Sequence, residues 1–148
     1  MTAPFIMLVD DEVLFVETMA KRLEKRNIEI LFAFSGEECL EKLKMNENLE
    51  VIVLDIVMPG MNGLETLKEI KKVFPLIEVI MLTGNATIET AIEGMKLGAF
   101  DFLIKPCDIK ELVNKVEDAA QKKREHQEKI KDAFKRETLA KYGPFYYT

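Results

Sequence analysis

The sequence lacks the residues from which several common kinds of site are built. It has one histidine, His126, so no zinc site or catalytic constellation with several histidines can form. Its two cysteines are too few for a disulfide framework, and we expect both to be reduced thiols. No GKS or GKT sequence occurs, and the first apolar run leads into acids rather than a glycine-rich loop. A phosphate-cradling nucleotide site is therefore not supported.

Long hydrophobic runs are also missing. The apolar runs, such as 51–54, are far too short to span a bilayer. The N-terminal segment MTAPFIMLVD has no basic region before its apolar run, which favours a first strand over a signal peptide. A chain of 148 residues with 48% hydrophobic and 32% charged residues fits one globular domain with a substantial core. We expect a cytoplasmic protein with no membrane contact.

Short apolar runs alternate with segments in which apolar residues have helical spacing. The runs, at 5–9, 28–34, 51–54, 79–82 and 100–104, are typical of buried parallel strands. The segment 87–97 predicts a helix that ends at Gly98. Other helix starts pair a capping residue with an acid three positions later: Ser35 with Glu38, Asn62 with Glu65, and Asp108 with Glu111. Five such βα units predict a single doubly wound α/β domain with right-handed crossovers.

Five polar residues follow the strands of this predicted sheet: Asp10, Asp11, Asp55, Thr83 and Lys105. The carboxyl ends of parallel strands meet at one crevice, where ligands bind. Three neighbouring carboxylates repel one another unless a cation lies among them, and all-oxygen ligation favours a hard ion such as Mg²⁺. A lysine and a hydroxyl beside that ion suit a phosphoryl group. The pattern predicts a site that holds phosphate on an aspartate.

The segments around these residues resemble the receiver domain of bacterial two-component response regulators, the CheY-like domain. They are VDDE after the first strand, VLDIVMPGMNG around the third strand end, MLTG at the fourth and FLIKP at the fifth. The resemblance covers roughly residues 4 to 120, and it is specific because four separate motifs occur in the right order. It implies a (βα)₅ fold with a five-stranded parallel sheet in the flavodoxin-like order 2-1-3-4-5.

The resemblance also implies a role for each acid. Asp55 would be the phosphoacceptor and a metal ligand, attacking phosphorus as a carboxylate nucleophile. Asp11 would bind Mg²⁺ directly, and Asp10 would help through metal-bound water. The backbone carbonyl of Val57 would complete the protein ligands. The side chains of Val57 and Asn85 flank the acceptor, and we hypothesise that apolar Val57 partly shields the acyl phosphate from water.

The remaining motif residues would bind and report the phosphate. Lys105 would supply a compact positive charge, while Thr83 and the amide of Gly84 would donate hydrogen bonds. In the family, this threonine moves toward the phosphate together with an aromatic residue on the fifth strand, which here is Phe102. Because Phe102 has no hydroxyl, a partner contact that needs a tyrosine hydroxyl is excluded.

These roles predict a phosphorylation-activated signalling switch. A sensor histidine kinase or phosphotransfer protein would donate its phosphoryl group to Asp55. The change would alter binding of an unknown output protein, or formation of a homodimer, through the face made by the fourth helix, fifth strand and fifth helix. We expect no direct nucleic-acid binding. We also expect no enzyme activity beyond self-catalysed transfer to Asp55 and slow autodephosphorylation.

Three alternatives stay open to different degrees. The chain could be the receiver part of a larger transcriptional regulator. The residues of such a part and of a stand-alone receiver are the same, so they do not distinguish the two. A phosphate-independent binding module is disfavoured, because close carboxylates are costly without a metal. A haloacid-dehalogenase-type phosphatase needs a second acid two residues after its nucleophile, and Val57 occupies that position.

The C-terminal part predicts a helical extension and tail, 121–148, after a receiver domain at 1–120. From Asp108 to about Lys141 there is no glycine or proline, so the last helix should continue. A buried stripe is expected at Val113, Val116 and Ala120, interrupted by Lys123 and Gln127 and resumed by Ile130, Ala133 and Phe134. The extension is either a solvated helix of mixed charge or a helix that binds a second copy or a partner.

Overall fold

The computed structural model describes residues 3–84 and 87–143. Asn85, which was expected to flank the acceptor, lies outside the described residues. The segment 144–148, at the end of the predicted tail, also lies outside them. Strands and helices alternate along the chain: β1 (Phe5–Val9), α1 (Val13–Glu24), β2 (Glu29–Ala33), α2 (Gly36–Lys44), β3 (Val51–Leu54), α3 (Gly63–Val73), β4 (Glu78–Thr83), α4 (Ile88–Lys96), β5 (Asp101–Ile104) and α5 (Ile109–Tyr142). The predicted elements are all present, with strand ends shifted by a residue or so.

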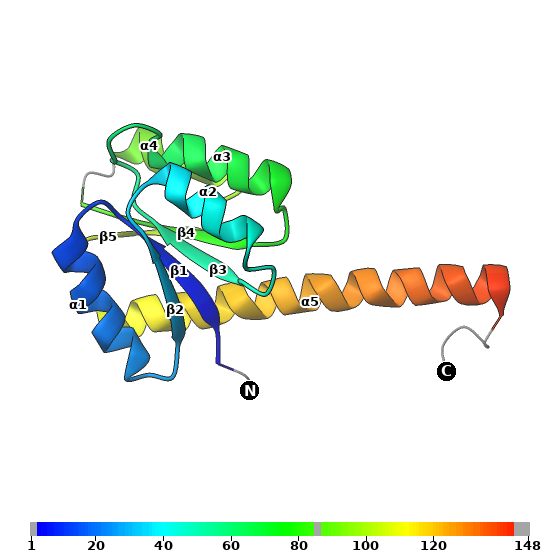
Figure 1. Cartoon of the computed structure of the whole chain (residues 1–148). Helices are drawn as coiled ribbons and strands as arrows, with labels where there is room; N and C mark the ends of the chain where they lie inside the picture. Colours follow the sequence, from blue (N-terminus) through cyan, green and yellow to red (C-terminus); the bar gives the residue numbers. More distant parts are fainter. Residues whose placement is uncertain (1–2, 85–86, 144–148) are drawn as a thin grey trace.

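The five strands form one parallel sheet in the order β2-β1-β3-β4-β5 (Figure 1). This confirms the doubly wound fold and the flavodoxin-like strand order. The order places β1 and β3 side by side in the middle of the sheet, with Val9 opposite Leu54. The residues that follow these two strands, Asp10 and Asp55, therefore leave the sheet as neighbours.

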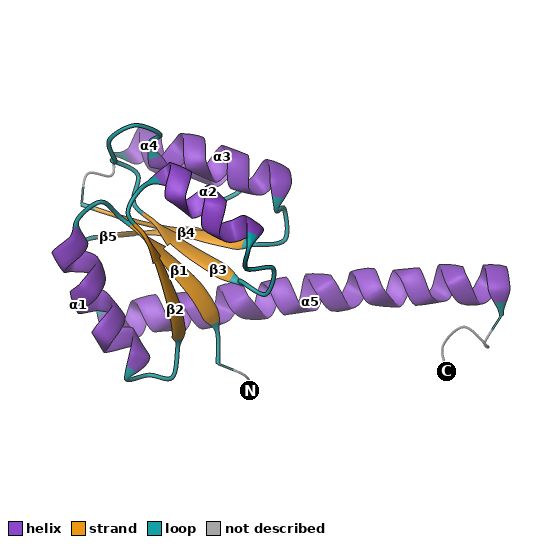
Figure 2. Cartoon of the chain, in the orientation of Figure 1, coloured by secondary structure: helices purple, strands orange, loops and turns teal. Residues whose placement is uncertain are grey.

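Helices cover both faces of the sheet, α1 and α5 on one side and α2, α3 and α4 on the other (Figure 2). Successive strand residues point to opposite faces, so each strand contributes to two cores. Ile6 and Leu8 pack with α1 and α5, whereas Met7 and Val9 pack with the opposite layer. Burial on both sides explains why the strands are continuous apolar runs.

Two of the predicted helix starts are capped as expected. The Ser35 hydroxyl accepts a hydrogen bond from the Glu38 backbone N–H at 3.1 Å, and Asn62 Oδ1 accepts one from the Glu65 N–H at 2.9 Å. Each bond satisfies one of the helix N–H groups that have no partner within the helix. The Asn62 cap starts α3 directly after the loop that carries Asp55.

A third helix start differs from the prediction. The Asp108 side chain accepts from the Lys110 N–H at 3.0 Å, not from the N–H of Glu111. A reciprocal capping box does occur at the start of α4, between Thr87 and Thr90. This box was not predicted from the sequence, because the third position holds a threonine instead of the usual acid, and the Thr90 hydroxyl accepts the reciprocal bond.

Helix α5 is a single helix of 34 residues, which confirms that the last helix continues well past the receiver motifs. The predicted interruption at Lys123 is wrong. Lys123 is 4% exposed and donates a hydrogen bond to the Leu49 backbone oxygen at 2.6 Å, while its long stem packs with the buried side of the helix. Gln127 is exposed, and Val113 is only half-buried.

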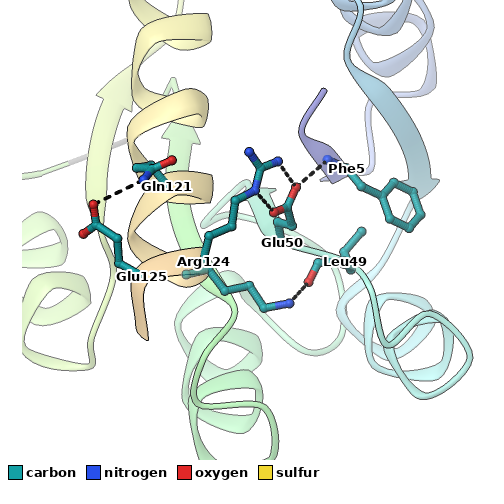
Figure 3. A network of polar contacts seen from close by, with 7 residues as sticks. Phe5, Leu49, Glu50, Gln121, Arg124 and Glu125 are labelled. Carbon is teal, nitrogen blue, oxygen red and sulfur yellow. Dashed lines mark hydrogen bonds and ion pairs between the residues drawn. The ribbon is translucent and has the colours of Figure 1, made fainter. Parts of the chain in front are cut away.

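Three consecutive cations fasten α5 to the amino-terminal edge of the sheet, and we call them the α5 anchor: Lys122, Lys123 and Arg124. Lys122 pairs with Glu78, the first residue of β4, at 3.3 Å. Arg124 pairs at 2.6 Å with Glu50, which directly precedes β3 (Figure 3). The same Glu50 carboxylate accepts a hydrogen bond from the Phe5 backbone N–H at 3.1 Å. The body of the domain thus contacts α5 beyond residue 120. The predicted domain boundary at residue 120 stays a prediction.

Beyond the α5 anchor, the helix projects away from the rest of the fold (Figure 1). Ile130 is 55% exposed and Phe134 is 66% exposed, so these two residues do not continue a stripe buried within this chain. No helix among the described residues is long and apolar enough to cross a membrane.

Candidate functional site

The predicted site residues meet at the carboxyl edge of the sheet. Backbone hydrogen bonds continue one step past the strands and fix where each side chain begins. The Asp10 N–H donates to the Ala33 oxygen at 3.1 Å, and the Asp55 N–H donates to the Val9 oxygen at 2.9 Å. On the other side, the Lys105 N–H donates to the Thr83 oxygen at 2.9 Å. The site is therefore built on the rigid sheet rather than on free loops.

Three carboxylates form the centre of this site, which we call the acid pocket: Asp10, Asp11 and Asp55. One oxygen of each lies within 4.8 Å of the others. Asp10 is 3% exposed and Asp55 is 6% exposed, whereas Asp11 is open to solvent. Hard divalent cations prefer oxygen ligands, and Mg²⁺ keeps several waters when it binds one or two carboxylates. The donor set and its partly open side fit such an ion.

Lys105 enters the acid pocket from the end of β5. Its Nζ lies 2.5 Å from Asp10 Oδ2 and 3.9 Å from Glu12 Oε1, and its side chain is 14% exposed. The other Asp10 oxygen accepts a hydrogen bond from the Glu12 backbone N–H at 3.0 Å. Asp10 is thus held from both sides.

Burial raises the pKa of Asp55 above its ordinary value, and the negative charge of Asp10 raises it further. Three groups act in the opposite direction: a hydrogen bond from the Thr83 side chain, the charge of Lys105 and a hydrogen bond from the Val57 backbone. The net shift is upward. An ionised Asp55 therefore gains from any further positive charge placed in the pocket.

Two further residues were predicted beside the acceptor, Val57 and Gly84. Val57 is 53% exposed, and its shielding of the acyl phosphate stays a prediction. Gly84 is exposed, and among the described residues a Cβ added there would find only the Lys105 Cβ, at 4.0 Å. The role of the Val57 carbonyl as a metal ligand stays a prediction.

Phe102, the predicted switch residue, is half-buried on β5. It packs against the core layer formed with α2 and α3. It also lines an apolar groove along α4. The groove residues are Ile88, Ala91, Ile92, Met95, Lys96 and Phe102. This places Phe102 between the interior of the domain and an exposed apolar surface, where Ile88 is 81% exposed.

Two residues of the site were not found from the sequence. Glu12 approaches Lys105, and the Phe15 ring on α1 lies 4.0 Å from the Lys105 Nζ. An aromatic residue in an amphipathic helix usually faces the core, and nothing in the local pattern distinguishes Phe15 from such a residue.

The chain belongs to the response regulator receiver domain family, whose family model matches residues 6–117. Domains of this family act in two-component signalling, and phosphorylation and Mg²⁺ are typical of them. The resemblance inferred from the motifs is thereby confirmed, together with the fold.

Particular relatives agree with this membership. The transcriptional regulatory protein CpxR homolog of Haemophilus influenzae is 39% identical over 75% of this chain and 48% of that protein, so the chain spans about half its length. A receiver domain protein from Clostridium thermocellum is 34% identical with a TM-score of 0.78, covering 82% of this chain and 97% of that chain. The CheX-CheY-BeF3-Mg²⁺ complex from Borrelia burgdorferi matches at 28% identity and TM-score 0.73, covering 76% and 86%.

Proposed function

We propose that this receiver accepts a phosphoryl group on Asp55 and acts as a phosphorylation-dependent switch. The observation that carries the proposal is the convergence of three carboxylates on one point, with the Lys105 ammonium 2.5 Å from Asp10. That combination suits a phosphoryl group on one carboxylate, balanced by a lysine and a divalent cation. The donor would be a sensor histidine kinase or a phosphotransfer protein.

The transfer forms a bond between an Asp55 carboxylate oxygen and phosphorus. The phosphorus–nitrogen bond of the donor phosphohistidine breaks, and the imidazole takes up one proton as it leaves. Lys105 and the Thr83 hydroxyl would stabilise the negative charge on the phosphoryl oxygens. Later hydrolysis returns Asp55 as a carboxylate and releases inorganic phosphate. No further turnover reaction is proposed, since Val57 occupies the position where a phosphatase of the haloacid-dehalogenase type needs an acid.

Mg²⁺ would be held by Asp11 and Asp55, by Asp10 through water and by the Val57 carbonyl. When bound, it would neutralise charge on the phosphoryl oxygens during transfer. The structural neighbour from Borrelia burgdorferi carries BeF3 and Mg²⁺ together in its complex, which supports the same pairing of ligands here.

Phosphorylation would shift the population between two arrangements of the domain. A phosphoryl group on Asp55 would attract Thr83, the last residue of β4, and Lys105, which directly follows the neighbouring strand β5. Phe102 lies on β5 two residues before the strand ends and borders the groove along α4. A change in the position of the Phe102 side chain would therefore alter the α4-β5-α5 face, where an output protein or a second copy would bind. In a longer regulator, such as the transcriptional relatives, the output would be joined to the receiver.

The experiment is the intact mass of the protein after incubation with phosphoramidate, with and without Mg²⁺. We expect a Mg²⁺-dependent gain of one phosphoryl group in the parent chain and in Asp118→Asn, whose exposed carboxylate on α5 lies outside the acid pocket. Asp55→Asn should show no gain.

Two results would count against the proposal. A gain that persists in Asp55→Asn would place the acceptor elsewhere. No gain in the parent chain, from phosphoramidate and from a phosphorylated histidine kinase alike, would favour a binding module that does not use phosphate.

A further inference from the structure

The ring of Phe15 lies against the ammonium group of Lys105. The Nζ is 4.0 Å from the centre of the ring, within the distance at which a cation is attracted to an aromatic face. On another side, the same Nζ contacts Asp10 at 2.5 Å, and the lysine side chain is 14% exposed. The ammonium is thus held between a carboxylate and a ring, largely out of water, where a cation–π contact is strongest.

Phe15 is fixed from behind by the interior of the domain. It lies in the first turn of α1, which begins at Val13, and packs against the core layer that contains α1 and α5. Its other side borders a small cavity of about 10 Å³ that Asp10 and Asp55 also line. Glu12, the remaining neighbour of Lys105, is 68% exposed and lies farther away, at 3.9 Å. A packed ring therefore defines the position of the ammonium better than this exposed and more distant carboxylate can.

We propose that Phe15 is a positioning residue, which keeps the Lys105 ammonium inside the acid pocket, ready to meet a phosphoryl group on Asp55. Without the ring, the flexible four-carbon stem of lysine is free to turn toward water, and ordering it again has an entropic cost. The inference rests on the proposed function, since the phosphoryl group is what the ammonium would meet.

The kinetic test compares rates of Asp55 phosphorylation by phosphoramidate in the presence of Mg²⁺. Phe15→Leu keeps an apolar side chain but removes the aromatic face, and we expect a rate about fivefold lower. Phe15→Tyr keeps the face and should restore the rate. The matched control is Phe100→Leu, which removes a ring from the same core layer but next to a different cation, Lys122, at 5.5 Å. A Phe15→Leu variant as fast as the parent would overturn the proposal.

A double-mutant cycle separates positioning from packing. In a Lys105→Met background there is no ammonium to hold, so Phe15→Leu should cause no further loss of rate. If the same fivefold loss appears without the ammonium, Phe15 acts through the packing of α1 and the inference is wrong.

A spectroscopic test needs no phosphorylation. Protons next to the Lys105 Nζ should resonate upfield of those of exposed lysines, because they lie over the Phe15 ring, and Phe15→Leu should abolish this shift. If the shift is present but the parent never gains a phosphoryl group, the proposed function fails while the placement of Lys105 stands. If the parent is phosphorylated but the shift is absent, the proposed function stands and the role of Phe15 fails.

Discussion

The Asp55 side chain is buried, and this burial is the main reason why its pKa lies above the ordinary value. The folded state then binds a proton more tightly than the unfolded chain does, so stability falls as pH rises from about the ordinary value of 3.8 through the raised one. At neutral pH the charged, buried form is a cost to the fold. We predict that Asp55→Asn is more stable than the parent at pH 7.

Urea unfolding at neutral and acidic pH measures this difference. It should shrink as the pH falls and vanish below about 3.8, where Asp55 is protonated in both the folded and the unfolded state. Mg²⁺ should raise the stability of the parent more than that of the variant, because binding to the native state stabilises it. A variant less stable than the parent at pH 7 would show that burial of Asp55 is not the dominant effect.

Gly63 gives the acceptor loop its close turn. A Cβ at this position would lie 2.2 Å from the Asp55 backbone oxygen and 2.5 Å from the Ile56 Cα. We predict that Gly63→Ala lowers the free energy of unfolding by about 2 kcal/mol, since backbone atoms must move. Gly84→Ala is the matched control, because its Cβ would meet no described residue closer than 4.0 Å, and it should change stability by less than about 0.5 kcal/mol. Equal effects in urea unfolding would contradict this account.

Val57 is placed beside the acceptor with 53% of its surface exposed. If its apolar side chain partly keeps water from the acyl phosphate, Val57→Asn should hydrolyse the phosphoryl group several-fold faster. The measurement is the decay of phosphorylated protein after the donor is removed, followed by intact mass. A variant that hydrolyses no faster than the parent would remove the support for shielding.

The sequence predicts some residues of the site and not others. Asp10, Asp55, Thr83 and Lys105 were predictable because each directly follows an apolar strand, and strand ends in a parallel sheet converge. Phe15 was not, because its contact with Lys105 depends on how α1 is rotated against the sheet. That rotation is set by packing with distant residues rather than by the local pattern.

At the scale of elements, the α5 anchor determines where the last helix leaves the domain. The Arg124 guanidinium donates two hydrogen bonds to Glu50, from Nε at 2.6 Å and from an η nitrogen at 2.8 Å. Paired planar contacts of this kind are stronger than single ones. The Glu50 hydrogen bond raises the pKa of Arg124 further, as expected for a stabilised cation.

A double-mutant cycle tests the anchor. We predict that Arg124→Met and Glu50→Gln each destabilise the fold, with a coupling energy of about 1 kcal/mol, because the pair is only partly exposed. The matched control is Arg136→Met, on the exposed extension, which should leave the unfolding free energy nearly unchanged. No coupling between Arg124 and Glu50 in urea unfolding would mean that the contact does not hold α5.

The extent of the helices was predicted better than which side of each helix is buried. The length of α5 followed from the absence of glycine and proline between 109 and 142. Its buried side did not, because Lys123 has an apolar stem that packs while its ammonium reaches a backbone oxygen of the loop before β3. A charge in the sequence is therefore weak evidence that a helix face is exposed, when a carbonyl acceptor lies within reach.

At the scale of the whole molecule, the domain body and the projecting helix separate at the α5 anchor. Removal of residues 126–148 should change the unfolding free energy by less than about 0.5 kcal/mol, since the large apolar side chains Ile130 and Phe134 are mostly exposed there. Removal of 121–148 deletes the anchor as well, and we predict a loss of about 2 kcal/mol or more. If both truncations behave alike in urea unfolding, the body ends before Lys122.

The account as a whole depends on where the phosphoryl group is attached, and reductive trapping locates it directly. Borohydride converts an aspartyl phosphate to homoserine, and peptide mass spectrometry of the protein treated with phosphoramidate and Mg²⁺ then identifies the residue. We predict homoserine at position 55, and only in samples that contained Mg²⁺. Homoserine at position 10 or 11, or its formation at position 55 regardless of Mg²⁺, would contradict the roles assigned to the three carboxylates.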